Sequence, residues 1–309
     1  FGSSGPIPTP ASPPVLRTRG MGAVYGVSLK YVALSALSGW GAKVVLLAEG
    51  ENATMDAATT ALLGLLCYSS CLNGVIAILF QLGIGMQLMG KNPSTGSVPL
   101  WSYVLFFSFH FPTWLYTSLH HLKDKASKIP SANEVEPGWW VGGRYAADLG
   151  KDWAGIVDMT CEFPEACFSR TDKYLLLPCW DGMPPLPEAL ERAALFATSA
   201  RASGDVLVHC AHGRGRSTTV LCACLVKAEL YPNWELALEA IKRHRKVAKL
   251  NRSMRSALAA WQAQYMDTTP KKAAAESESE SDELAAWGLG RCARKALQNL
   301  RLYGRSKLK

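Results

Sequence analysis

The first 122 residues contain three long stretches with almost no charge, and this feature constrains the fold more than any other. Val24–Ala48 carries only two lysines, Ala57–Met89 runs 33 residues without a charged side chain, and Val98–Leu119 is aromatic-rich and uncharged. A helix needs about 20 apolar residues to cross a bilayer, and a small soluble domain cannot easily bury three such stretches. Residues 21–122 are therefore predicted to form a helical transmembrane region.

The number of membrane spans stays open between two, three and four. Ala57–Met89 is long for one straight span and short for two, and Asn73-Gly74 at its centre indicates a tight hairpin or a kink. Val98–Leu119 has the length of one span. Basic residues precede the first stretch and follow the last, which requires an even number of spans if both ends lie on one side. Four spans or two satisfy this condition.

Beyond Pro137 the pattern changes to short β-type runs that alternate with amphipathic helical patterns. The expected strands are Trp139–Val141, Gly155–Asp158, Tyr174–Leu177 and Val206–His209. The expected helices are Pro187–Ser203, Ser217–Glu229, Trp234–Lys246 and Arg252–Tyr265. This alternation predicts an α/β fold with a mainly parallel central sheet flanked by helices. Residues 123–266 are predicted to form this soluble domain.

Three further segments differ in composition from both regions. Residues 1–20 are rich in Pro, Ser and Gly and are expected to be a flexible arm, and residues 267–283 are expected to be an acidic, disordered linker. Residues 284–309 form a basic tail, either an amphipathic helix on an anionic membrane surface or a solvated segment. The net charge is +8, and residues 285–309 hold seven basic residues and no acidic one. The basic charge is therefore weak evidence for nucleic-acid binding.

The nine cysteines of the chain show no repeated CxxC spacing and no zinc-ligand set, so no metal site is expected. Most are expected to be small, buried apolar side chains. Cys222 and Cys224 lie two positions apart on an expected helix and should therefore point in different directions. This cysteine usage fits a reducing compartment, cytosolic or organelle-interior, better than secretion.

One segment carries the chemistry. Asp205–Ser217 is a buried-type strand, a loop with two glycines and then a helix. The unpaired N–H groups and positive dipole end of a helix start suit a phosphate dianion and stabilise a thiolate, here that of Cys210. Arg216 lies six positions later, where a loop curled around phosphate brings its planar guanidinium to two oxygens. Gly213 and Gly215 remove side chains where backbone amides must turn inward.

The run from His209 to Ser217, His-Cys-x5-Arg-Ser, is identified as the signature of the protein tyrosine phosphatase superfamily, and its flanks resemble the dual-specificity branch. The resemblance covers roughly residues 137–265. It implies hydrolysis of phosphate monoesters through a phospho-cysteine intermediate, with no cofactor. It also implies that His209 supports the loop and the thiolate, while Ser217 hydrogen-bonds Cys210 and helps it leave. The residues expected to bind substrate are Ala211, His212, Gly213, Arg214 and Gly215.

The same resemblance requires a general acid, an aspartate on a loop upstream of the cysteine. Asp181 lies 29 residues before Cys210 in a Pro-rich segment and is predicted to protonate the leaving oxygen and then to activate water. Taken alone, Asp181-Gly182 would be read as a turn. Asp158 and Glu162 follow an expected strand and either line the site or cap local structure.

Three functions compete. The first is a membrane-anchored dual-specificity phosphatase that acts on phosphorylated proteins. The second is a lipid phosphatase for phosphoinositides or phosphatidylglycerophosphate, favoured by the positive charge of Arg214 and by membrane tethering. Against it, Ala211 stands where several lipid-acting relatives have a basic residue. The third is an inactive membrane scaffold, although such proteins usually lose the cysteine or the arginine. The expected partners are a phosphorylated protein or phospholipid headgroup and the bilayer, and no nucleic acid.

Overall fold

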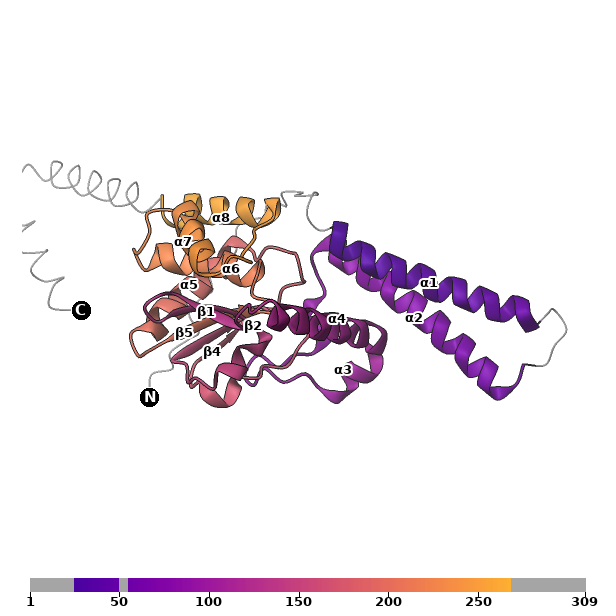
Figure 1. Cartoon of the computed structure of the whole chain (residues 1–309). Coiled ribbons are helices and arrows are strands. Elements are labelled where there is room, and N and C mark those ends of the chain that lie inside the picture. Colours follow the sequence, from indigo (N-terminus) through magenta and orange to yellow (C-terminus); the bar gives the residue numbers. More distant parts are fainter. Residues whose placement is uncertain (1–24, 50–54, 268–309) are drawn as a thin grey trace, which may run out of the picture.

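The computed structural model describes residues 25–49 and 55–267 (Figure 1). The arm expected at 1–20, the tail expected at 284–309 and all but residue 267 of the expected linker lie outside the described residues.

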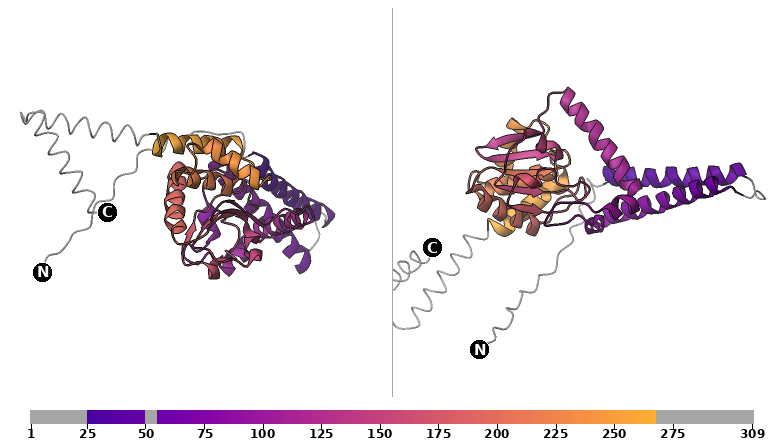
Figure 2. Two further views of the ribbon diagram at one scale, coloured as in Figure 1. Left: turned by 60° about the vertical axis from the view of Figure 1, so that its left-hand side comes forward. Right: turned by 90° about the horizontal axis from the view of Figure 1, so that it is seen from below.

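Two long helices begin the described chain. α1 (Tyr25–Glu49) and α2 (Ala57–Leu82) lie side by side as a hairpin that projects away from the remainder of the molecule (Figures 1 and 2). Gly26–Glu49 and Ala57–Leu82 are the two described segments that are long and apolar enough to cross a membrane. Their large apolar side chains are mostly exposed, for example Trp40 at 67% and Leu47 at 70%.

Small polar residues join the two helices of the hairpin. Ser35 Oγ donates to the Ser70 carbonyl over 2.8 Å, and Ser70 Oγ donates to the Ser35 carbonyl over 2.9 Å. Gly39 lies against Ser70, where an added Cβ would be 3.0 Å from its hydroxyl oxygen. Close approach through small residues and side-chain hydrogen bonds is typical of helix pairs in membranes.

The turn expected at Asn73-Gly74 does not form, because α2 runs unbroken through both residues. The Asn73 amide donates to the Ser69 carbonyl over 2.8 Å, one turn back in α2, and to Ser108 Oγ of α4 over 3.2 Å. α2 ends instead at Gly83, which adopts the left-handed conformation (φ 66°) common at helix C-termini. The arrangement with four spans is therefore wrong.

The third apolar stretch is not a single spanning helix. It divides into the short helix α3 (Leu100–Leu105) and α4 (Phe107–Ala126), with a break at Phe106. α4 continues past the apolar stretch into a polar segment, and it buries Phe109, His110 and Thr117. α4 runs from beside the hairpin toward the sheet domain (Figure 2).

The remainder of the chain forms the predicted α/β fold. The sheet order is β1-β2-β5-β3-β4, with β2 (Trp139–Gly143), β5 (Val206–Cys210), β3 (Gly155–Asp158) and β4 (Tyr174–Leu176) parallel. The sequence did not predict β1 (Ala132–Glu136), which pairs antiparallel with β2 at the edge. Its alternation of two glutamates and an asparagine with apolar residues lacks the continuous apolar run of the central strands.

Four helices cover one face of the sheet: α5 (Pro187–Arg201), α6 (Arg216–Lys227), α7 (Trp234–His244) and α8 (Arg252–Tyr265) (Figure 1). Asn233 and Asn251 cap α7 and α8 by accepting backbone N–H bonds. The 3-10 turns η2 (Arg144–Leu149) and η3 (Phe168–Arg170) accompany a smaller core on the other face. A further turn, η1 (Met86–Met89), follows α2.

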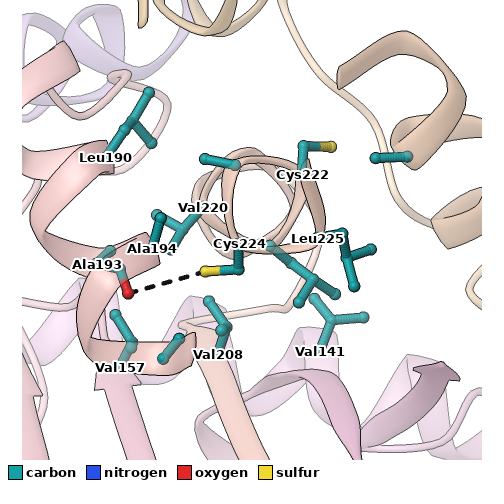
Figure 3. Close-up of a cluster of buried hydrophobic side chains, with 14 of the residues drawn as sticks. Val141, Val157, Leu190, Ala193, Ala194, Val208, Val220, Cys222, Cys224 and Leu225 are labelled. Atoms are coloured by element: carbon teal, nitrogen blue, oxygen red, sulfur yellow. Dashed lines mark hydrogen bonds between the residues drawn. The ribbon is translucent and has the colours of Figure 1, made fainter. Parts of the chain in front are cut away.

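α6 lies at the centre of the main core. Val141, Val157 and Val208 from three strands pack beneath it (Figure 3). Cys222 and Cys224 are fully buried and point in different directions, as predicted; Cys224 Sγ approaches the Ala193 carbonyl at 3.9 Å. The core therefore fixes the first turn of α6 firmly over the end of β5.

Buried contacts cross the boundary expected at residue 123. The ammonium of Lys91, between η1 and α3, is buried against Asp158 at the end of β3 and donates to Thr160 Oγ1 over 2.9 Å. The backbone N–H of Glu165 donates to the Gly96 carbonyl over 2.9 Å. Trp180 Nε1 donates to the Ile84 carbonyl over 2.8 Å. Residues 84–97 therefore pack as part of the sheet domain.

Candidate active site

The loop that follows the central strand is built around a sulfur atom. β5 ends at Cys210 and α6 begins at Arg216, so the loop lies at the carboxyl edge of the parallel sheet, where such folds bind ligands. The Gly213 N–H donates to Cys210 Sγ over 3.3 Å, and Ser217 Oγ lies 3.4 Å from the same sulfur. Gly213 has φ 67°, and an added Cβ would lie 2.4 Å from the Gly142 carbonyl carbon, so only glycine fits.

Cys210 differs electrostatically from the other buried cysteines. Burial raises the pKa of Cys179 to about 12 and raises that of Cys161 well above its usual value. Burial also opposes ionisation of Cys210, but the Arg216 charge and hydrogen bonds from Ser217 lower its pKa below the ordinary thiol value. A cysteine thiolate is the form that can attack phosphorus, and these surroundings favour that form at Cys210.

Arg216 is 1% exposed, and its guanidinium donates to two backbone carbonyls and to the Glu162 carboxylate. Its Nη1 donates to the Cys179 carbonyl over 2.6 Å, and its Nη2 donates to Glu162 Oε1 over 2.7 Å. The sequence left open whether Glu162 lines the site or caps local structure, and the structure places it where it orients this guanidinium. Arg216 Nε is buried without a hydrogen-bond partner among the described residues, and this N–H suits a phosphate oxygen.

Asp181 lies beside the same guanidinium. Its Oδ1 is 3.3 Å from Arg216 Nη2, and its side chain is 42% exposed. Burial alone would raise the Asp181 pKa, but Arg216, then His212 and Lys30, lower it below the usual value. Asp181 is thus ionised and paired with Arg216 when no phosphate occupies the loop.

A second group of charges lies behind the loop. His209 Nε2 is 2.5 Å from Glu165 Oε2 and 3.8 Å from Asp158 Oδ1. Burial disfavours the charged imidazole, but Glu165 and Asp158 raise the His209 pKa to about 9. Burial also disfavours the Asp158 carboxylate, but Lys91 and His209 lower its pKa to about 2. His209 therefore carries a positive charge next to Cys210 in the chain at neutral pH. Its Nδ1 has no hydrogen-bond partner among the described residues, so its expected support of the loop and the thiolate stays a prediction.

The same group offers the donor types of a metal site, since one atom each of Asp158, Glu165 and His209 lie within 4.8 Å of one another. Lys91 already neutralises Asp158, however, and Glu165 binds the imidazole. A divalent cation would have to displace two cations from a buried position. These residues therefore suit a charge network better than a metal.

The remaining loop residues divide into two kinds. Ala211 and His212 line the cavity beside the loop. Burial lowers the His212 pKa to about 4, so this imidazole is neutral near pH 7. Arg214 instead donates to Asp124 Oδ1 over 2.6 Å, so its charge is used at the end of α4. The positive charge that favoured a phosphoinositide substrate is thus already paired.

Sequence reasoning missed three contributors to the site. Arg245 follows α7 and donates to the Gly213 carbonyl over 2.6 Å and the His212 carbonyl over 3.1 Å, so it holds the loop from behind. Lys91 and Glu165 hold Asp158 and His209. A lysine between two apolar segments and a glutamate in an irregular loop gave no pattern to find. Their partners are 67 and 44 residues away in the chain.

A cavity of about 290 Å³ opens beside the loop. The sheet domain contributes Glu162, Trp180, Asp181, Ala211 and His212 to its wall. The rest of the wall is helical and largely apolar: Val27, Lys30, Tyr31, Ala33, Leu34 and Leu37 from α1, Phe80 from α2, and Phe109, Pro112, Thr113, Tyr116 and Thr117 from α4. Cys210, at 3% exposure, lies behind this lining.

Part of the chain is similar to a known phosphatase. Over 136 residues the chain is 35% identical to dual specificity protein phosphatase 12 of Rattus norvegicus. The sheet domain is similar to dual-specificity phosphatases. The match covers 41% of this chain and 40% of that relative, so it spans two fifths of the relative's length. No family model matches.

Similar solved structures include human DUSP28, with 22% identity and a TM-score of 0.37 over 44% of this chain and 95% of that chain. They also include PTPMT1 in complex with PI(5)P, with 21% identity and a TM-score of 0.37 over 44% of this chain and 96% of that chain.

Proposed function

We propose that the chain is a membrane-anchored phosphatase that hydrolyses phosphate monoesters through a phospho-cysteine intermediate. The observation that supports this most is the joint position of three groups: the Cys210 sulfur under inward N–H groups, the buried Arg216 guanidinium, and Asp181 at 3.3 Å from that guanidinium. An inactive scaffold would not need an acidic thiol and a paired, buried arginine in one loop.

In the first step, the Cys210 thiolate attacks phosphorus and the bond between phosphorus and the leaving oxygen breaks. Because Cys210 and Arg216 are almost fully buried, the phosphate must first replace Asp181 beside Arg216. This exchange removes the main partner that lowers the Asp181 pKa and places a dianion nearby. Both changes favour the protonated carboxyl group, which then donates its proton to the leaving oxygen.

In the second step, water attacks the phospho-cysteine and the phosphorus–sulfur bond breaks. Asp181, now a carboxylate, accepts the proton from that water. The electron pair returns to sulfur, where the Gly213 N–H and the Ser217 hydroxyl stabilise the thiolate. Inorganic phosphate leaves, Asp181 releases the proton to solvent and pairs with Arg216 again, and the chain returns to its starting state.

The membrane anchor is the α1–α2 hairpin. Its support is two helices of spanning length, exposed apolar side chains, and hydrogen bonds between small residues. Both helices meet the sheet domain at the same end of the hairpin, so two spans place the catalytic domain on one side of the bilayer (Figure 1). That side is a reducing compartment, because the mechanism needs a free thiol.

The printed name of the similar relative makes a phosphorylated protein one candidate substrate class. The proposed reaction is tested with the full chain in detergent and p-nitrophenyl phosphate, which any such site can accept. We expect hydrolysis without added metal and its loss in Cys210→Ser. Hydrolysis that persists at the same rate in Cys210→Ser would contradict the mechanism.

A further inference from the structure

The wall of the catalytic cavity raises a question about substrate that the loop alone cannot answer. Ala211 and His212 of the loop, with Trp180 and Asp181, form one side of the cavity, and side chains of α1 between Val27 and Leu37 form another. The same helix is one of the two segments long and apolar enough to cross a membrane. A phosphate group in this loop is therefore bordered by a surface that continues along a proposed membrane helix.

Aromatic contacts tie this helical wall to the catalytic segment. Tyr31 of α1 lies 5.2 Å from Phe80 of α2 and 5.5 Å from Phe109 of α4, measured between ring centroids. Phe80 stacks on Trp180 at 4.6 Å, and Trp180 precedes Asp181. Trp180 is also held by its hydrogen bond to Ile84. The helices are thus packed against the general-acid segment and form a fixed side of the cavity.

Both polar and apolar side chains line the cavity. Lys30 Nζ lies 4.1 Å from the Tyr116 ring centroid, and its charge acts on Asp181. Farther along α1 the wall is Ala33, Leu34 and Leu37. A peptide laid along this part would bury backbone N–H and C=O groups without partners, at a cost of about 1–3 kcal/mol for each group. A hydrocarbon chain has no such groups and gains from the contact.

Resting on the proposed phosphatase activity, we infer that the substrate is a phosphate monoester of a membrane lipid, whose hydrocarbon chain lies against α1 and α4 while its phosphate occupies the Cys210 loop. The lipid would reach the site from the bilayer along α1, because the wall of the cavity and the membrane helix are one surface. The charge of Arg214 plays no part, since Asp124 pairs it.

The test compares substrates that share a phosphate and differ in chain length. The full chain in phosphatidylcholine vesicles is given glycerol 3-phosphate or dioctanoyl phosphatidic acid. We expect kcat/KM for the dioctanoyl lipid to exceed that for glycerol 3-phosphate by at least about tenfold, because burying a few methylene groups suffices for that factor.

Two matched variants separate the cavity from simple partitioning into vesicles. Ala33 lines the cavity and Ala36 does not, yet both are exposed and lie on the same helix. Ala33→Trp places a large side chain in the proposed chain path and should lower the ratio of the two kcat/KM values by about tenfold or more. Ala36→Trp, in the same vesicles, should leave the ratio unchanged.

The outcomes distinguish the inference from the function on which it rests. Activity that depends on Cys210 but shows equal ratios in Ala33→Trp and Ala36→Trp would overturn the lipid site and leave the phosphatase intact. A higher kcat/KM for a soluble phosphotyrosine peptide than for the dioctanoyl lipid would do the same and favour a protein substrate. The absence of hydrolysis of every phosphate monoester would overturn both proposals.

Discussion

The two charge clusters of the sheet domain contain similar residues but differ in whether every member is buried. Behind the loop, Lys91, His209 and two carboxylates pair with one another in the protein interior. At the loop, Arg216 pairs with buried Glu162 and with Asp181, whose side chain is 42% exposed. The first cluster has no member that can leave. The second has one movable carboxylate, and that carboxylate is the proposed general acid.

The comparison shows that the exposure of the partners decides how easily a charge pair opens. A fully buried pair is costly to break because the remaining charge has no water around it. A pair with one exposed partner opens easily, since water can replace that partner. Removing a member of the buried cluster is therefore expected to lower the stability of the protein. Removing the exposed member of the loop cluster is expected to lower the catalytic rate instead.

Removal of the movable carboxylate should have the largest effect on rate. In Asp181→Ala, kcat for an alkyl phosphate should fall by about 10²–10⁴, the usual contribution of a general acid. The unfolding midpoint should change little, because the Asp181 side chain is partly exposed. Steady-state kinetics and thermal unfolding on one preparation check both parts. A strong loss of stability would mean that the two clusters do not differ as described.

Removal of the buried lysine, Lys91, should mainly lower stability. Lys91→Ala leaves the Asp158 carboxylate buried without its main partner, so the free energy of unfolding should fall by about 3–5 kcal/mol. Lys151→Ala breaks a partly exposed pair with Asp205 (2.6 Å) and is the matched control, with an expected loss below about 1 kcal/mol. Denaturant unfolding of both variants measures the difference. Equal losses in the free energy of unfolding would contradict a special role of Lys91 in neutralising a buried carboxylate.

The inner cluster should also make stability depend on pH. The His209 pKa rises on folding from 6.5 to about 9, so its stabilising contribution is complete below pH 6.5 and is lost as pH rises through 9. Unfolding of Cys210→Ser, which avoids thiol titration at that position, should therefore show a decline in stability across this range. Glu165→Gln removes the first charge that raises the pKa and should flatten the decline. An unchanged slope in Glu165→Gln would contradict the assignment.

The smallest effect is expected at Arg214. Because this guanidinium is paired with Asp124 outside both clusters, Arg214→Ala should change KM for p-nitrophenyl phosphate by less than about fivefold, the equivalent of 1 kcal/mol. Arg216→Lys is the comparison. Lysine lacks the planar, two-pronged guanidinium, so KM should rise far more in this variant. An equal rise in KM for the two variants would mean that Arg214 binds phosphate.

The features that the sequence predicted well are local. A strand, a loop with glycines and a helix at fixed spacing place Cys210, Arg216 and Ser217 together whatever surrounds them. Alternating patterns likewise predicted the central strands and the four helices over the sheet. Asp181 required the resemblance to a family, because an Asp-Gly pair by itself indicates a turn.

The features that it did not predict depend on distant partners. Asn73-Gly74 is a turn signal in isolation, yet the contacts of Asn73 with Ser69 and Ser108 keep it helical. Val98–Leu119 has the composition of a span but breaks at Phe106 and packs beside the site. Lys91 lies in a segment that composition assigned to the membrane region, and its role depends on a carboxylate 67 residues away.

The position of Lys91 has a consequence for proteolysis. A protease that cut the chain between Gly96 and α4 would separate the sheet domain from Lys91, which neutralises Asp158, and from the backbone segment that binds Trp180 and Glu165. We expect such a cut to inactivate the proposed phosphatase rather than to release it from its proposed anchor.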